Sequence, residues 1–244
     1  MALTSREYTD QMRINDIFLS FFIVLLIVIV IYHTNSIERV HTRLDAAIAG
    51  EVLSSNIKRT IRSYIVTNDE DYLDEYWNLV NIRYGDAKWG EYVIDTPYFN
   101  ENTMTLHEIY EDVGISEEAH EYFDRAEKIG ETAIWKEIEA INWARGFFDT
   151  DGKGKEQFDL ANPKGFVAFT DKQEPDRQAA IDNMYNQEFM KNERLEHELF
   201  TKGYNVEQRT TTNETKSTKY SIIILSILLL MSSIYKLTHS FKSH

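Results

Sequence analysis

The strongest constraint on the fold of this chain is a pair of uncharged apolar runs, one near each end of its 244 residues. Residues 17–32 read IFLSFFIVLLIVIVIY and residues 220–235 read YSIIILSILLLMSSIY. A helix needs about 20 residues, within a range of about 17 to 25, to cross the hydrocarbon core of a bilayer. Each run reaches that length with neighbours that tolerate the lipid headgroups. The sequence therefore predicts two transmembrane helices, at 17–34 and 220–237.

These two spans divide the rest of the chain into a short tail at 1–16, a long loop at 35–219 and a short tail at 238–244. No small-x-small cleavage site follows the first run, so we expect an uncleaved anchor and not a signal peptide. Two spans place both tails on one side of the membrane and the loop on the other. Basic residues flank the spans in nearly equal number on both sides, so charge alone does not orient the chain.

Composition argues against several functional classes. The chain carries 26 Lys and Arg against 40 Asp and Glu, for a formal net charge of -14, and it has no Cys. Nucleic-acid binding needs patches of Lys and Arg, and none of any length appears, so we expect no nucleic-acid partner. Without Cys there is no disulfide and no thiolate metal site. No nucleophile elbow or phosphate-binding glycine loop is present, so we expect neither an enzyme nor a cofactor.

The loop has the apolar periodicity of helices. Apolar residues recur at helical spacing from Ile37 to Ile65, and the polar triplet at 67–69 ends that pattern. Residues 117–148 are apolar over a broad arc, which predicts a central helix. A third stripe is predicted on Ile181, Tyr185, Glu188, Asn192, Leu195 and Leu199. Such helices must bury their stripes against one another, with 71–83 or 106–113 as a fourth member. We expect an all-α protein, an antiparallel helical bundle flanked by the two transmembrane helices.

The segment around the 67–69 turn resembles a known family. Arg62, Tyr64, Thr67, Asn68 and Asp69 follow an Arg-x-Tyr-x-x-Thr-Gly-Asp pattern, with further Tyr residues downstream. This pattern is similar to that of the extracytoplasmic helical sensor region of bacterial transmembrane receptors, and further similar segments extend over most of the loop. Asn68 replaces the usual Gly, and Asn is the residue that most readily takes a positive φ in its place.

The resemblance implies a function and a location. Domains of that family precede chemotaxis, histidine kinase and cyclase outputs, so it implies a periplasmic sensor domain of the bacterial inner membrane, a homodimer, and a small-molecule ligand or a periplasmic binding protein as partner. Residues 237–242, LTHSFK, look like the opening of a HAMP linker with Ser240 in place of the usual Pro. We therefore expect an input half that lacks its output, with signalling through a partner as the alternative.

The candidate ligand site comprises two arginines and nearby aromatic residues: Arg62, Tyr64, Arg83, Trp77, Trp135 and Trp143. Paired guanidinium groups between aromatic walls suit a carboxylate or phosphate ligand, because each presents a planar pair of donors. The alternative is that the arginines form ion pairs with nearby acidic residues and hold the turn rigid, while the tryptophans of 117–148 belong to the core.

We expect no metal site. His107 and Glu111 stand four residues apart, as a metal-binding pair would on a helix, but their own helix supplies no third ligand and the chain has no His-Glu-x-x-His motif.

The sequence thus predicts a membrane-bound sensor that binds a ligand in its helical bundle and transmits the signal through its two spans. The alternative is a structural or regulatory subunit whose bundle docks another membrane protein. A pocket lined by arginines and aromatic residues would favour the sensor, and a flat exposed apolar patch would favour the docking subunit.

Overall fold

The computed structural model describes residues 5–154, 169 and 171–242, with the side chains of 5–19, 91, 92, 232 and 235–242 left out of the description. It is almost entirely helical. The helices are α1 (Ser5–Thr67), α2 (Glu70–Arg83), α3 (Gly90–Val93), α4 (Pro97–Asn100), α5 (Leu106–Val113), α6 (Glu117–Ala144), α8 (Arg177–Tyr185) and α9 (Gln187–Lys242). The two short strands β1 (Phe147–Phe148) and β2 (Asp171–Lys172) pair antiparallel. The prediction of an all-α protein is confirmed at this level.

The chain divides into two compact units, and α1 and α9 contribute to both. The first unit comprises Met1–His41 and Arg209–His244, and the second comprises Thr42–Gln208. Parts of the predicted tails, residues 1–4 and 243–244, lie outside the described residues, as do the side chains of the HAMP-like segment at 237–242.

The first unit carries large apolar side chains on its surface. Val30 of α1 is 62% exposed and Leu230 of α9 is 58% exposed, and their apolar neighbours are similar. Within the described residues, one helical stretch, Ser20–Thr67 of α1, contains an 18-residue segment that is apolar enough to cross a membrane, with a mean hydropathy of 2.1. The second predicted span is helical as part of α9, and its role as a span stays a prediction.

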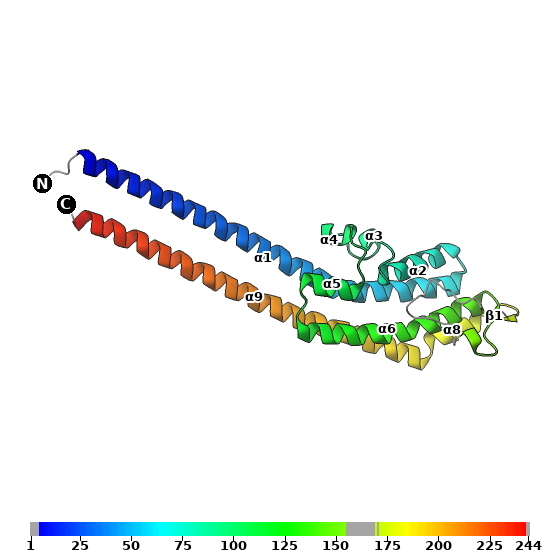
Figure 1. Cartoon of the computed structure of the whole chain (residues 1–244). Coiled ribbons are helices and arrows are strands. Elements are labelled where there is room, and N and C mark those ends of the chain that lie inside the picture. The colour runs from blue at the N-terminus through cyan, green and yellow to red at the C-terminus, as the bar shows by residue number, and fades with distance from the viewer. Residues whose placement is uncertain (1–4, 155–168, 170, 243–244) are drawn as a thin grey trace. The chain divides into compact units, whose positions relative to one another are not determined.

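The second unit is a helical bundle in which α1, α2, α6 and α9 run alongside one another (Figure 1). Along the contact between α1 and α9, residue numbers rise in α1 as they fall in α9: Arg43 contacts Glu207, Ser54 contacts Glu196 and Arg62 contacts Glu193. In the same way, Tyr76 and Arg83 of α2 contact Glu137 and Glu127 of α6. The neighbouring helices of these pairs are therefore antiparallel, as the sequence predicted.

Local sequence accounts for the helix ends. Asn68 has a φ of 59°, so the residue that replaces Gly in the family pattern adopts the left-handed conformation that it was expected to tolerate. The Asp69 side chain then accepts the backbone N–H of Asp71 at the start of α2. α5 begins with a capping box between Thr105 and Glu108, and the left-handed Gly114 ends it. These turns fix where α2 follows α1 and where α6 follows α5.

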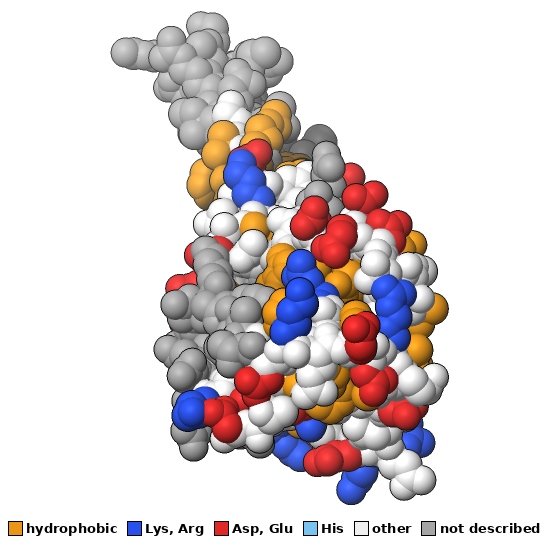
Figure 2. Space-filling model, turned by 90° about the vertical axis from the view of Figure 1, so that its right-hand side faces the viewer, with side chains coloured by type: hydrophobic (Ala, Val, Ile, Leu, Met, Phe, Trp, Pro, Cys, Tyr) orange, Lys and Arg blue, Asp and Glu red, His pale blue; other side chains and the backbone are white. Residues whose placement is uncertain are grey.

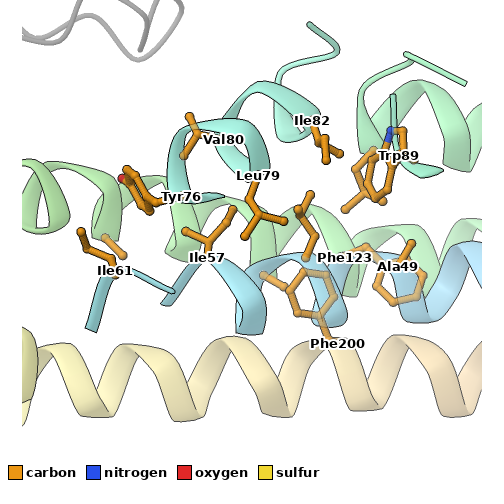
Figure 3. Close-up of a cluster of buried hydrophobic side chains, with 14 of the residues drawn as sticks. Ala49, Ile57, Ile61, Tyr76, Leu79, Val80, Ile82, Trp89, Phe123 and Phe200 are labelled. Atoms are coloured by element: carbon orange, nitrogen blue, oxygen red, sulfur yellow. The ribbon is translucent and has the colours of Figure 1, made fainter. Parts of the chain in front are cut away.

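The bundle core lies between these helices and is rich in large side chains. Figure 3 shows members of it from four helices and the α2–α3 connection: Ala49, Ile57, Ile61, Tyr76, Leu79, Val80, Ile82, Trp89, Phe123 and Phe200. Phe123 of α6 stacks on Tyr110 of α5, with ring centroids 4.7 Å apart. A Cβ at Gly203 of α9 would lie 2.7 Å from Cδ1 of Phe123, so Gly allows α9 to approach this ring closely.

The predicted stripe over 181–199, which the structure divides between α8 and α9, is correct at Leu199, which is buried, and wrong at Tyr185 and Leu195. Tyr185 and Leu195 are 49% and 39% exposed, whereas Glu196 is buried. Two features explain the difference. The helix breaks at Asn186, whose side chain accepts the N–H of Phe189, and α9 starts anew after this residue. Glu196 is then turned inward, where it pairs with side chains of α1.

The face of the molecule in Figure 2 mixes both signs of charge. Acidic and basic side chains lie interspersed across it, with hydrophobic atoms between them. This face therefore presents no single-sign patch among its described residues.

Candidate functional site

The bundle buries an ion pair between α1 and α9. Lys58 is 5% exposed and Glu196 is 2% exposed. The Lys58 ammonium contacts one carboxylate oxygen of Glu196 and also donates to the Ser54 hydroxyl at 3.0 Å. The Ser54 hydroxyl donates in turn to the other Glu196 oxygen at 2.5 Å. Both carboxylate oxygens thus have partners, as a buried charge requires.

A second buried polar contact joins α2 to α6. The Tyr76 hydroxyl donates to Oε2 of Glu137 at 3.0 Å, and both side chains are buried. Burial raises the pKa of Glu137, and the positive charge of Lys58 opposes that rise. Burial likewise raises the pKa of the Tyr76 hydroxyl well above its ordinary value. Tyr76 therefore remains a hydrogen-bond donor over the whole physiological pH range.

A cavity of about 230 Å³ borders the Ser54–Glu196 contact. Its polar lining residues are Ser54, Arg83, Tyr84, Thr105, His107, Glu127, Glu131 and Glu196, and its other lining residues are Gly50, Leu53, Leu106 and Phe200. They come from α1, from the end of α2, and from α5, α6 and α9. We call this space the Arg83 cavity.

Arg83 is placed at the cavity by the last turn of α2 and by a glycine opposite. Its guanidinium donates to the backbone carbonyl of Glu127 at 3.2 Å. A Cβ at Gly130 of α6 would lie 2.7 Å from Nη2 of Arg83 and 2.7 Å from Oε1 of Glu196. The absence of a side chain at Gly130 is what lets these two charged groups reach α6. Within the described part of the chain, no carboxylate forms an ion pair with Arg83.

Buried polar atoms without hydrogen-bond partners border the cavity. They include Oε1 of Glu127 and the hydroxyl of Tyr84, and the hydroxyl of Tyr110 lies next to Gly50 of the lining. Buried polar atoms in native proteins nearly always have a partner, which is protein, ordered water or a ligand. Two other cavities, of about 270 and 340 Å³, also reach Glu196, but their lining side chains include no such unpartnered atom among the described residues. The Arg83 cavity is therefore the stronger candidate for a binding site.

Glu127 gives this cavity a titratable group near neutral pH. Burial raises its pKa to about 7, and the Arg83 charge counteracts part of that effect. Asp124 and Glu131 raise the pKa further, and His107 lowers it. The carboxyl can therefore be neutral or charged in the physiological range, according to what lies beside it.

The two predicted arginines occupy different places. Arg62 forms a two-pronged ion pair with Glu193 at 2.8 and 3.0 Å, and its guanidinium lies 4.8 Å from the ring centre of Tyr185. It does not line the Arg83 cavity. Arg62 thus links α1 to the α8–α9 segment by ion pairing, which was the alternative interpretation, although its partner is Glu193 and not an acidic residue of the turn.

The predicted aromatic residues lie in the packing around the site. Tyr64 is fully buried, and burial raises the pKa of its hydroxyl. Trp77 and Trp135 pack in one cluster with Ile134, Ile138 and Phe169, and Trp143 stacks on Phe148 with centroids 6.3 Å apart. None of these residues lines the Arg83 cavity. Of the predicted site residues, the structure places only Arg83 there.

Sequence reasoning missed the carboxylates of the cavity. Glu127, Glu131 and Glu196 appear in the sequence among many acidic residues, and nothing marks them apart from that background. The clearest sequence signal for the buried ion pair with Glu196 was Lys58, a charged residue directly after Ile57 in the apolar stripe of α1.

Comparisons of the chain with protein-family models, with curated proteins and with solved structures found no match.

Proposed function

We propose that this chain is a membrane-anchored sensor whose helical bundle binds a small polar ligand in the Arg83 cavity. The observation that carries the proposal is the cavity itself, whose lining combines Glu127 and Tyr84, each with an unpartnered buried atom, and Arg83, whose guanidinium has no ion-pair partner among the described residues. A bundle built only for mechanical support would have its buried charges paired, as Lys58 and Glu196 are.

The lining chemistry favours a ligand that carries both charges. Arg83 offers planar donors that suit a carboxylate, while Glu127 and Glu131 offer acceptors that suit an ammonium group. The volume of about 230 Å³ lies below the range of about 300 to 1,000 Å³ that drug-sized ligands occupy. A free amino acid or a similarly small zwitterion fits these conditions best.

The exposed apolar side chains of the first unit support the membrane part of the proposal. Apolar surface exposed to water costs about 25 cal/mol for each Å², so long helical segments with side chains such as Val30 and Leu230 on their outside are suited to lipid. We propose that both α1 and α9 cross the inner membrane of a bacterium, with the bundle on the periplasmic side and with the chain as a homodimer.

The proposed mechanism is differential binding. The cavity lining combines residues of α1 and α9 with residues of α2, α5 and α6. A ligand that prefers one packing of these helices over another by a few kcal/mol would shift the population between the two packings. Because α1 and α9 also contain the predicted spans, such a shift would be transmitted as a displacement of one span relative to the other.

The test of ligand binding is the melting temperature of the full chain in nanodiscs with amino acids, simple amines and dicarboxylates as probes. Ligands that bind the folded state raise this temperature by mass action. We expect stabilisation by one or more amino acids, and its loss in the Arg83→Lys and Glu127→Gln variants. Arg62→Lys is the matched control, because Arg62 lies outside the cavity. Equal shifts in the Arg83 and Arg62 variants, or no shift with any probe, would contradict the proposal.

Topology has a separate test. The chain has no Cys, so each single-Cys variant reports one position. A membrane-impermeant maleimide should label Lys128→Cys, which is exposed on α6, from the periplasmic side of intact cells, and should label Ser5→Cys only after the inner membrane is permeabilised. Labelling of both positions from the same side would rule out a membrane span between them.

A further inference from the structure

Three side chains from two helices bring metal-binding atoms together on the outside of the bundle. His107 belongs to α5, while His120 and Asp124 stand four residues apart on α6. Nδ1 of His107 lies 3.2 Å from Nε2 of His120 and 3.5 Å from Oδ1 of Asp124. The third separation, between Nε2 of His120 and Oδ1 of Asp124, is 3.4 Å. These atoms therefore form a nearly equilateral triangle.

The size of this triangle matches one face of a zinc coordination tetrahedron. Zinc bonds to histidine nitrogen and carboxylate oxygen are about 2.0 to 2.2 Å long, which makes the edge of the tetrahedron about 3.4 Å. The three observed separations, 3.2, 3.4 and 3.5 Å, lie close to that edge. An ion at bonding distance from all three donors is thus possible without moving a helix, and it would leave a fourth position for water or another ligand.

The fold holds these side chains in place from the inside. The chain turns at Gly114, and α6 runs antiparallel to α5. This arrangement places Asp124 of α6 opposite His107 of α5. The ring of Tyr110 packs edge-on against His120 at 5.8 Å and stacks on Phe123. The ligand triangle is therefore anchored to a buried aromatic cluster.

A carboxylate stands behind the first histidine. Oε1 of Glu111 lies 3.5 Å from Nε2 of His107, the ring nitrogen that does not belong to the triangle. A carboxylate in this position orients the ring of a metal-bound histidine and increases its basicity. Glu111, which in the sequence resembled half of a metal pair, would therefore support the ligand His107 from outside.

We propose that His107, His120 and Asp124 bind a divalent zinc ion that clamps α5 onto α6. Two imidazoles and one carboxylate suit zinc, whereas calcium and magnesium prefer oxygen ligands throughout. The side chains are 50%, 22% and 45% exposed, so an ion reaches them from solvent. His107 also lines the Arg83 cavity, so the same ion holds one wall of that cavity. Without metal, the two rings share a hydrogen bond.

The test is calorimetric titration of the full chain in nanodiscs with Zn²⁺, after chelator treatment and dialysis. A parallel titration with Co²⁺ follows its visible absorption, which becomes intense on tetrahedral coordination. We expect one tight site for each chain, no competition from Mg²⁺ or Ca²⁺, and a higher melting temperature with Zn²⁺.

Single substitutions assign the site. His120→Asn and Asp124→Asn should weaken Zn²⁺ binding by more than about 100-fold, and Glu111→Gln by about 10-fold, at the low end of what loss of an outer carboxylate costs. His197→Asn is the matched control, because this exposed histidine of α9 contacts Glu51, away from the triangle. Circular dichroism of each variant establishes that it is folded. Unchanged affinity in the folded His120 and Asp124 variants, or no tight Zn²⁺ site in the unaltered chain, would overturn the proposal.

Discussion

Two polar regions of the same bundle differ in how completely their charges are paired. At the α1–α9 contact, both carboxylate oxygens of Glu196 have partners in Lys58 and Ser54. At the Arg83 cavity, the guanidinium has a backbone carbonyl as its partner, and Oε1 of Glu127 is buried without one. The first arrangement fixes two helices in register. The second leaves polar groups without protein partners, and a ligand can bind to them. The incomplete pairing therefore distinguishes the candidate binding site from the structural ion pair.

The largest expected effect comes from breaking the buried Lys58–Glu196 ion pair. Lys58→Met leaves the Glu196 carboxylate buried without a compensating charge, and we expect a loss of about 3 to 5 kcal/mol in the free energy of unfolding. The measurement is urea unfolding of the chain in nanodiscs, followed by tryptophan fluorescence. Lys128→Ala, on the exposed face of α6, is the control and should change stability by less than about 0.5 kcal/mol.

Two further variants sharpen this difference. Lys58→Met combined with Glu196→Leu should recover most of the lost stability, because neither charge then remains buried. Arg83→Met should cost only about 1 kcal/mol, since it loses one hydrogen bond and Glu127 can take up a proton near neutral pH. Similar losses for the single Lys58 and Arg83 substitutions would show that the two regions are not energetically different.

The second effect is a pH dependence that belongs to the cavity. The folded pKa of Glu127 is about 7, above its ordinary value of 4.5, so the folded chain holds this proton more tightly than the unfolded chain does. The resulting stability is fully present below about pH 4.5 and is lost as the pH rises through 7. Full loss corresponds to about 3 kcal/mol.

Glu127→Gln tests that dependence. Between pH 5 and pH 8 the unaltered chain should lose about 2.5 kcal/mol of unfolding free energy relative to this variant, because glutamine does not titrate. Glu118→Gln, an exposed position on the same helix, should follow the unaltered chain at every pH. Parallel profiles for the unaltered chain and the Glu127 variant would mean that Glu127 titrates normally.

The smallest effect compares two glycines at helix contacts. A methyl group at Gly203 meets the buried ring of Phe123, which is stacked on Tyr110 and cannot move aside. We expect Gly203→Ala to cost about 1 to 2 kcal/mol, after the gain in helix propensity of about 1 kcal/mol is counted. At Gly130 the methyl group meets Nη2 of Arg83 and Oε1 of Glu196. The long Arg83 side chain can shift, whereas Glu196 is held by Lys58 and Ser54. Gly130→Ala should therefore cost less stability than Gly203→Ala but reduce amino-acid binding in the cavity, and an equal loss of stability in both variants would contradict this distinction.

The prediction from sequence was accurate where neighbouring residues decide the conformation. The end of α1 at Thr67 and the left-handed Asn68 followed from the polar triplet at 67–69. The central helix was expected over 117–148 and is observed at Glu117–Ala144. In each case the periodicity or the turn residue lies within a few positions of the structure that it specifies.

The prediction failed or was incomplete where distant segments meet. Leu195 was expected inside and lies outside, because the neighbouring Glu196 finds Lys58 and Ser54 on α1. Arg62 and Arg83 were expected to share a ligand, yet Glu193 from α9 binds Arg62 and leaves Arg83 at the cavity. His107 lacked a third candidate ligand on its own helix, and the structure brings the His120 ring and the Asp124 carboxylate of α6 beside it.

The sequence by itself determined that this chain is helical, that its apolar residues concentrate in two terminal runs and in helical stripes, and where several of its helices end. These properties depend on residues a few positions apart. Only the tertiary structure decided which charges are paired, which carboxylate is left without a partner and which histidines meet. Those outcomes depend on how antiparallel helices align, and a rotation by one residue exchanges a buried side chain for an exposed one.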